Sequence, residues 1–184
     1  MTQLGKYDIL EELGRGGFGI VYKAHDISLD RMVALKELQA QLTVDPGFLE
    51  HFRREARALA RINHANVVTI YEIGEEQGRV YIAMEYLPGG SLRDRLTEGP
   101  IPLEEALRIT QEVADGLDAG HAKGLVHRDV KPGNILFNEH GEAVIADFGL
   151  AKALQISSSS VQSSVGGVGT PHYRPPELWN GTPP

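Results

Sequence analysis

Apolar and polar residues alternate in three short stretches near the N-terminus, a pattern that predicts strands with one buried face. The stretches are 7–10 (YDIL), 20–24 (IVYKA) and 32–36 (MVALK), separated by a glycine-rich turn and by the turn DISLD. Two further strand-like stretches, 67–73 and 79–85, flank the turn GEEQG. The first half of the chain therefore predicts five strands.

One amphipathic helix is predicted between the third and fourth of these strands. Over residues 46–62 apolar side chains recur at helical spacing, and Glu55 lies at the edge of their stripe. The stripe consists of Leu49, Phe52, Ala56 and Leu59.

The sequence LPGGS (87–91) interrupts this pattern and marks the best internal boundary, after which the chain is mainly helical. Ser91, with Asp94 three residues later, predicts a capped short helix. A longer helix is predicted over 102–121, followed by a small hairpin of strands 135–137 and 143–146. The inward face expected for the longer helix consists of Leu103, Ala106, Leu107, Thr110, Val113, Ala114 and Leu117. This order predicts an α+β protein with two lobes.

Composition narrows the functional classes. The 184 residues carry a net charge of −7, without a block of Lys or Arg, so a nucleic-acid partner is not expected. There is no cysteine, which excludes disulfides and thiolate metal sites. We find neither a signal-peptide pattern nor the run of about 20 apolar residues that crosses a bilayer, and we expect no membrane contact in this segment and a cytoplasmic location.

The glycine-rich turn reads LGRGGFGIV (13–21). Glycines allow backbone to approach a phosphate closely, because no Cβ intervenes. Alone the motif is weak, since such turns are common and dinucleotide-binding proteins contain a similar string. In those proteins the glycines lead from a strand into a helix, whereas here they lead into another strand, which argues against that class.

Lys36 lies in the third predicted strand. Strand alternation places Ala34 and Lys36 on one face, which we expect to point toward the glycine-rich turn. A lone strand lysine is most often a solvated charge. With Glu55 on the next helix as a partner, it becomes a candidate phosphate-binding group.

Two later segments carry polar side chains suited to a phosphoryl-transfer site: HRDVKPGN (127–134) and ADFG (146–149). Asp129 and Asp147 supply carboxylates and Asn134 a neutral oxygen, the ligand types that Mg²⁺ prefers. Each residue alone fits an ordinary turn. Ordinary turns do not explain all of them together in this order, after a glycine-rich turn and a strand lysine.

From Tyr7 to about Gly181 this series of motifs resembles the eukaryotic-type serine/threonine protein kinases, in a bacterial style. The resemblance implies an N-lobe with hinge over 1–87 and a partial, mainly helical C-lobe over 88–184. The N-lobe would be a five-stranded antiparallel sheet with one helix. The C-lobe would contain a catalytic loop (127–134) and an activation segment (147–177).

The resemblance also implies that ATP is the phosphoryl donor, with Mg²⁺ as its metal. Gly14, Gly16 and Gly19 would cover the phosphates. Lys36 would contact the α- and β-phosphates, with Glu55 as its partner. The adenine site implied consists of Val21, Ala34 and Leu136 around the ring, Met84 as gatekeeper, and Glu85, Tyr86 and Leu87 on the hinge.

In the catalytic loop, the resemblance makes Asp129 the base that accepts the substrate hydroxyl proton and Lys131 a stabiliser of the transferring group. Asn134 and Asp147 would be the Mg²⁺ ligands. Thr170 would hydrogen-bond Asp129 and Lys131. By position, Leu59, Ile70, His127 and Phe148 would form a stack that couples helix placement to activity.

Regulation is expected at Arg128, which would bind a phosphate on the activation segment. We hypothesise that Ser163 or Ser164 receives it from another copy of the kinase, which requires self-association. The run Ser157–Ser160 is expected to be a flexible spacer instead.

Family domains continue beyond the position of Pro184, with an arginine that pairs with the Glu177 equivalent. The chain is therefore expected to be a truncated kinase domain with weak nucleotide binding and little activity on its own.

The alternative function is a catalytically silent kinase-like binding or regulatory module. A small-molecule kinase is disfavoured by Arg128, Lys131 and the segment 169–177. Serine/threonine protein substrates are favoured, because Lys131 follows Asp129 by two residues.

Overall fold

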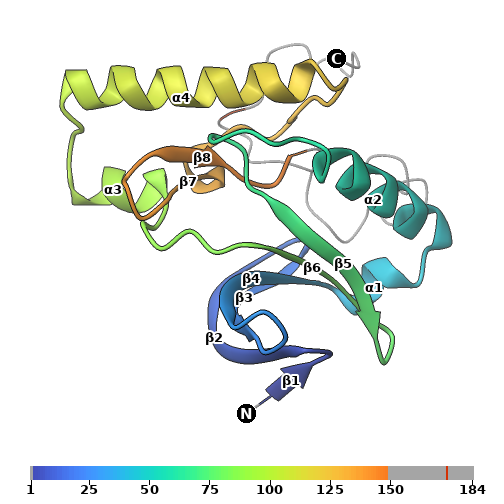
Figure 1. Cartoon of the computed structure of the whole chain (residues 1–184). Helices are drawn as coiled ribbons and strands as arrows, with labels where there is room; N and C mark the ends of the chain where they lie inside the picture. The colour runs from blue at the N-terminus through green and yellow to red at the C-terminus, as the bar shows by residue number, and fades with distance from the viewer. Residues whose placement is uncertain (1, 149–172, 174–184) are drawn as a thin grey trace.

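The computed structural model describes residues 2–148 and 173. Its first half is a curled antiparallel sheet of six strands in the order β1-β2-β3-β4-β6-β5 (Figure 1). The strands are β1 (Thr2–Leu4), β2 (Tyr7–Gly16), β3 (Gly19–Asp26), β4 (Arg31–Leu38), β5 (Ile70–Glu76) and β6 (Arg79–Glu85). The five predicted strands are confirmed, although β5 begins at Ile70 instead of residue 67.

The prediction of a five-stranded sheet with one helix was incomplete. The additional strand, β1, pairs antiparallel with β2 around a turn in which Gly5 has φ of 57°. Leu4 and Tyr7, at the two ends of this turn, are both buried. Three residues are too few to display an alternating pattern, so no strand was predicted there.

A short helix, α1 (Ala40–Thr43), also precedes the predicted one and buries Leu42. The predicted helix is α2 (Pro46–Leu59), which begins with proline in its first turn. The side chain of Asp45 caps it by accepting hydrogen bonds from the N–H groups of Gly47 (2.9 Å) and Phe48 (3.3 Å).

Successive side chains of β4 point to opposite faces of the sheet and belong to two apolar clusters, one on each face. Val33 and Leu35 pack on the face that also holds Leu4 and Tyr7. Ala34 and Leu38 pack on the opposite face with the buried side of α2. Lys36 shares this second face by strand alternation, so a charged side chain enters the α2-facing layer.

The second half contains α3 (Leu92–Glu98), α4 (Leu103–His121), the 3-10 turn η1 (Pro132–Asn134), β7 (Ile135–Phe137) and β8 (Ala143–Ile145). The two strands form a hairpin that lies between α4 and the large sheet (Figure 1). The predicted capping box of α3 is confirmed: Ser91 N–H donates to Asp94 Oδ2 (2.9 Å), and Asp94 N–H donates to Ser91 Oγ (3.3 Å).

The inward face predicted for α4 was only partly right: Val113 and Leu117 pack against the core, but the two leucines of the first turns do not. Leu103 and Leu107 are 76% and 62% exposed, whereas Ile109, Gly116 and Gly120 are buried. The buried face is set by close backbone approach. A Cβ on Gly116 would lie 2.6 Å from the carbonyl oxygen of Asn66, and one on Gly120 would lie 2.5 Å from the ring of Phe148.

The segment between α2 and β5 joins the two halves a second time, apart from the chain connection after β6. Ile145 N–H donates to the Asn66 carbonyl and Val68 N–H donates to the Ile145 carbonyl, both at 2.9 Å. The amide Nδ2 of Asn66 donates to the Ala143 carbonyl (2.8 Å). The β7–β8 hairpin is thereby hydrogen-bonded to the segment that leads into the large sheet.

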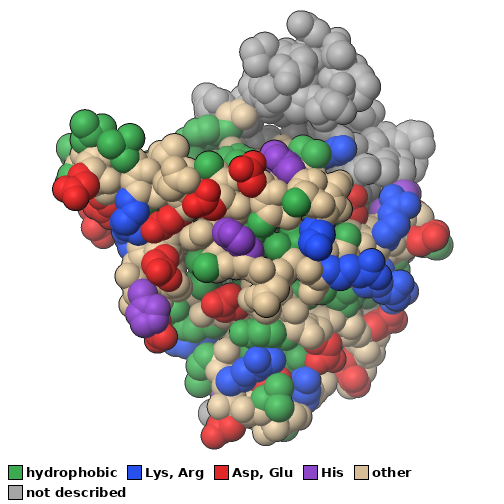
Figure 2. All heavy atoms as spheres, turned by 45° about the horizontal axis from the view of Figure 1, so that its top comes forward, with side chains coloured by type: hydrophobic (Ala, Val, Ile, Leu, Met, Phe, Trp, Pro, Cys, Tyr) green, Lys and Arg blue, Asp and Glu red, His purple; other side chains and the backbone are tan. Residues whose placement is uncertain are grey.

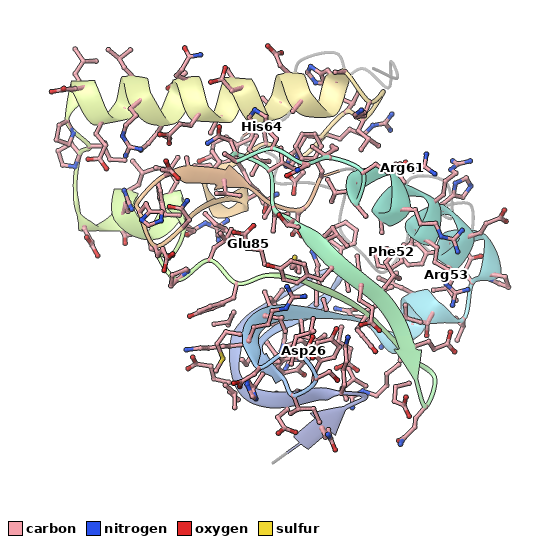
Figure 3. All side chains as sticks on the ribbon, viewed as in Figure 1. Asp26, Phe52, Arg53, Arg61, His64 and Glu85 are labelled. Atoms are coloured by element: carbon pink, nitrogen blue, oxygen red, sulfur yellow. The ribbon has the colours of Figure 1, made fainter. Side chains whose placement is uncertain are left out.

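Charged side chains are unevenly distributed on the face shown in Figure 2. Lys and Arg side chains gather on the right, the side on which Figure 3 shows Arg53 and Arg61. Asp and Glu side chains gather toward the left, where α4 begins with Glu104 and Glu105. In the part of the chain that the structure describes, no helix is long and apolar enough to span a bilayer.

Gly19 provides a direct test of the sheet at the glycine-rich turn. It has φ of 155°, and a Cβ there would lie 1.8 Å from the carbonyl oxygen of Glu37 on β4. We expect Gly19→Ala to lower the free energy of unfolding by about 2 kcal/mol or more. Gly16→Ala is the matched control, because nothing lies within 4 Å of its Cβ position. Urea unfolding of both variants measures the difference, and equal stabilities would contradict this role of Gly19.

Candidate functional site

A cavity of about 730 Å³ lies between the large sheet and the segment 129–147. Most of the predicted site residues line it. Those from the sheet and hinge are Gly14, Gly16, Gly19, Val21, Ala34, Lys36, Met84, Glu85, Tyr86 and Leu87. Those from the second half are Asp129, Lys131, Asn134, Leu136 and Asp147. Residues separated by more than a hundred positions thus meet at one cavity.

The glycine-rich turn connects β2 and β3, as the argument against a dinucleotide site required. Gly16 and Gly19 are paired across the turn. Gln39, just after β4, holds this turn through two hydrogen bonds. Its side-chain Nε2 donates to the Gly16 carbonyl and its backbone N–H donates to the Phe18 carbonyl, both at 3.0 Å. The backbone of the turn is therefore held over the cavity.

Lys36 forms an ion pair with Asp147, with Nζ 2.6 Å from Oδ1. The lysine side chain is 5% exposed and the aspartate side chain 33% exposed. Burial acts to raise the pKa of Asp147, but the charge and hydrogen bond of Lys36 outweigh it. Smaller contributions come from His127 and Lys131, and the pKa stays below its ordinary value. Asp147 is therefore ionised at neutral pH.

Glu55, the partner predicted for Lys36, lies on the buried side of α2. The ion pair of Lys36 with Asp147 was not predicted from the sequence, which suggested Glu55 as the partner of the lysine. Only the packing of the two halves brings Asp147 to Lys36.

The catalytic-loop candidates hold one another in place. Lys131 Nζ donates to Asp129 Oδ2 (2.6 Å), and Asn134 Nδ2 donates to the Asp129 carbonyl (2.8 Å) and to Oδ2 (3.1 Å). The side chains of Asp129 and Lys131 are only 11% and 19% exposed. Since its amide nitrogen is directed to Asp129, Asn134 has its side-chain oxygen available as a cation ligand.

His127 is buried beneath this loop with a defined tautomer. Nε2 lies 2.9 Å from the Ala146 carbonyl, which can only accept, and Nδ1 accepts from Asp129 N–H at 3.2 Å. The proton is therefore on Nε2. Burial lowers the pKa of His127, while the Ala146 hydrogen bond and the charges of Asp147 and Asp129 act in the opposite direction. The ring is neutral at neutral pH.

The predicted stack of side chains packs together. Leu59 and Phe148 belong to one buried cluster, and Ile70 packs against it. The His127 and Phe148 rings are 4.7 Å apart between centroids. A continuous apolar path thus runs from α2 to the loop that contains Asp129.

Two backbone positions at the site have left-handed conformations without being glycine. Arg128 has φ of 69° and Asp147 has φ of 62°. Aspartate tolerates this region better than arginine, so Arg128 is the more strained of the two. Arg128 lies between His127 and Asp129, and Asp147 follows Ala146, all of which form the hydrogen bonds described above. These two conformations therefore fix the direction of the backbone at the site.

The residues suggested for adenine also lie together. Val21, Ala34 and Leu136 pack in one cluster with Met84. Glu85, seen in Figure 3 where the sheet meets the second half, donates its N–H to the Thr69 carbonyl at 2.9 Å. This hydrogen bond anchors the beginning of the hinge to the segment that joins α2 and β5.

The described residues contain no group of three or more His, Cys, Asp or Glu side chains that could hold a metal. Asn134 and Asp147 together offer two oxygen-bearing side chains at the same cavity. Such a pair suits Mg²⁺, which keeps several waters and is bound by few protein ligands together with substrate phosphates.

Several predicted residues lie outside the described part of the chain: Ser163, Ser164, Thr170 and Glu177. Conversely, sequence reasoning missed cavity residues that the structure adds: Arg15, Phe18, Ser91, Arg93 and Gly133. A cavity-facing role for Arg93 had no sequence signal, because it depends on how α3 packs against η1.

Comparisons with known proteins agree with this arrangement. The protein kinase domain family matches residues 7–183. The chain is 41% identical over 178 residues to the serine/threonine-protein kinase PrkC of Bacillus subtilis, covering 96% of this chain and 27% of PrkC. It is also 41% identical to the serine/threonine-protein kinase PknL of Mycobacterium bovis, covering 94% of this chain and 43% of PknL.

A solved structure of a point mutant of the PknI kinase domain of Mycobacterium tuberculosis superposes with a TM-score of 0.78 at 29% identity. The alignment covers 100% of this chain and 68% of that one. The two-lobed fold is confirmed, and the chain spans about a quarter to under a half of the length of these two curated relatives.

The neutral state of His127 predicts a pH dependence of stability. Because its pKa in the folded chain is below the ordinary value of 6.5, the unfolded chain binds the proton more readily. The stabilisation is present above pH 6.5 and is lost as the pH falls below it. We expect the melting temperature to fall between pH 7 and pH 5, and His127→Phe to reduce that fall.

His140→Asn is the control for this measurement, because the His140 side chain is 73% exposed. It is expected to retain the pH dependence of the unchanged chain. An equal pH dependence in the His127→Phe variant would refute the assignment.

Proposed function

Because the chain belongs to the protein kinase domain family, we propose that the protein transfers the γ-phosphoryl group of ATP to serine or threonine hydroxyls of protein substrates. Relatives about 40% identical over most of this chain bear the name serine/threonine-protein kinase. The domain would work on the cytoplasmic side of the cell, where ATP is abundant.

The observation that carries the proposal is the meeting of two charged groups at one cavity. One is the Lys36–Asp147 ion pair, at 2.6 Å, which joins β4 to the segment after β8. The other is the Asp129–Lys131–Asn134 set, whose members bond one another at 2.6 to 3.1 Å. Phosphoryl transfer needs alignment and positive charge more than covalent chemistry, and these groups supply both.

The nucleotide would lie between the glycine-rich turn and the hinge. The backbone of Gly14, Gly16 and Gly19 would face its phosphates, and the Lys36 ammonium would balance their charge. The apolar set formed by Val21, Ala34 and Leu136 would enclose the adenine. Asn134 and Asp147 would hold Mg²⁺, which supplies further neutralisation of phosphate charge when bound with ATP.

Asp129 is the proposed base. Its carboxylate would accept the proton of the substrate hydroxyl as that oxygen attacks phosphorus. The Lys131 hydrogen bond at 2.6 Å keeps the carboxylate oriented, and its ammonium would stabilise the group being transferred. The Asn134 bonds to Asp129 restrict the loop further, so little reorganisation is needed at the moment of reaction.

Thr170 is proposed to hydrogen-bond Asp129 and Lys131. Glu55 is proposed to pair with Lys36 in the active arrangement.

The second candidate function is a catalytically silent kinase-like module. The presence of Lys36, Asp129 and Asp147 argues against it, because catalytically silent kinase-like proteins usually lose residues of these types. Nucleotide binding without phosphoryl transfer by the intact protein would favour this second function.

Substitution of the charged groups tests the catalytic proposal. In the intact protein with Mg²⁺ and ATP, Asp129→Asn is expected to lower kcat by about 10²- to 10⁴-fold, since a general base is removed. Asp115→Asn, an exposed position on α4, is the matched control and should retain full activity. Incorporation of labelled phosphate into a protein substrate provides the measurement. Equal activity of the two variants would sink the assignment of Asp129.

Lys36→Met and Asp147→Asn test nucleotide binding separately. Both break the ion pair, and both are expected to abolish the rise in melting temperature that Mg²⁺ and ATP produce in the intact protein. Asp147→Asn is also expected to lower stability by about 1.5–3 kcal/mol without nucleotide, because Lys36 stays buried without its counter-charge. An unchanged nucleotide-induced shift in both variants would contradict the proposed site.

Activation-segment phosphorylation is the proposed regulation, with Arg128 as the binding group. We expect phosphosite mapping after incubation with ATP to find phosphate on Ser163 or Ser164. The double variant Ser163→Ala/Ser164→Ala should lose most activity, and unchanged activity would count against the hypothesis. Dilution of the kinase should slow the phosphorylation if a second copy performs it.

A further inference from the structure

Arg93 lies at the mouth of the cavity, close to the proposed catalytic base. It is the second residue of α3, it is exposed, and it lines the same cavity as Asp129 and Lys131. Its guanidinium extends across to η1, the turn that follows the catalytic loop. A positive charge from α3 thereby reaches the turn that directly follows the catalytic loop.

Gly133 makes room for this arrangement. A Cβ at position 133 would lie 2.7 Å from Arg93 Nη2 and 3.0 Å from its Cζ. Any other residue would therefore push the guanidinium away. Arg93 and Gly133 form a matched pair, in which the missing side chain of one provides the space for the other.

The nearby acids already have other partners. Asp94 Oδ2 accepts from both the N–H (2.9 Å) and the hydroxyl (2.6 Å) of Ser91. Asp129 accepts from Lys131 and Asn134. Over residues 2–148 Arg93 forms no hydrogen bond or ion pair, although its charge makes a small contribution to the lowered pKa of Asp94, so its donors are available to a ligand.

The neighbouring arginine of α3 differs in this respect. Arg95 donates to Glu105 (2.9 Å) and lies 3.3 Å from the centroid of the Phe137 ring. The charge of Arg95 is therefore already engaged by groups of the folded chain. A cation in the first turn of a helix, as at Arg93, is also opposed by the helix dipole, so local stability does not explain the residue.

We propose that Arg93 selects protein substrates with an anionic side chain a few residues from the acceptor serine or threonine. This inference rests on the proposed function and names its substrate class. The ligand is a carboxylate or a phosphorylated residue, either of which a guanidinium binds through charge-assisted hydrogen bonds.

The position of Arg93 limits how many residues can separate the anionic side chain from the acceptor. Gly133, beneath the guanidinium, adjoins Asn134, whose Nδ2 is 3.1 Å from the Asp129 carboxylate. An extended peptide advances about 3.3 Å per residue, so an acceptor at Asp129 brings a nearby side chain to Arg93. The anionic residue therefore belongs to the same short segment as the acceptor.

The test uses the intact protein with Mg²⁺ and ATP on a positional set of peptides around one acceptor threonine. Each position carries Asp, phosphoserine, Ala or Lys in turn, and kcat/KM is measured for every peptide. At one or more positions we expect an anionic residue to be favoured over Ala by about 10-fold, the effect of one charge-assisted hydrogen bond at an exposed site. Comparison of Asp with phosphoserine identifies which anion is recognised.

Variants then assign the preference to Arg93. Arg93→Ala should bring the ratio of kcat/KM for anionic and Ala peptides close to one, and Arg93→Glu should invert it in favour of Lys. Arg93→Lys should retain part of the preference. The control is Arg61→Ala, an exposed arginine after α2 that lies across the molecule from α3 (Figure 3). The preference should also weaken as salt concentration rises.

The outcomes separate this inference from the proposed function. Phosphorylation without preference for anionic peptides, or a preference that persists in Arg93→Ala and Arg93→Glu, overturns the role of Arg93 while the kinase activity stands. Absence of phosphate transfer to every peptide and protein substrate overturns the proposed function itself, and the substrate inference with it.

Discussion

The ion pair between Lys36 and Asp147 is the interaction on which the site depends. It joins a strand of the sheet to the segment after β8 across 111 positions of sequence, with an N to O distance of 2.6 Å. Because the lysine is buried, losing its partner would leave a charge in a poorly solvated place. The pair therefore favours an arrangement in which the two halves of the chain face each other around one cavity.

Close backbone contacts make that arrangement specific. Asn66 and Val68 exchange hydrogen bonds with Ile145, and Gly116 lets α4 approach the Asn66 carbonyl. Directional hydrogen bonds between the two halves limit sliding more strictly than apolar packing would. Phe148 then lies between His127 and the α2 side of the core, so the position of α2 and the position of the catalytic loop are mechanically linked.

Much of this could be predicted from sequence, because the signals are local. Strand alternation gave the shared face of Ala34 and Lys36, and the capping box gave the beginning of α3. The prediction failed where the signal was short or not local. β1 has only three residues, and the most buried side of α4 includes Gly116, which approaches the backbone of Asn66, and Gly120, which approaches the ring of Phe148.

The sequence by itself determined most of the elements, the motif order and the family, since each follows from residue types at fixed spacing. Tertiary structure alone decided that Lys36 pairs with Asp147, and that Arg93 lies over Gly133. The physical reason is that spacing fixes which side chains share a face of one element. The distance between side chains of different elements depends on how those elements pack.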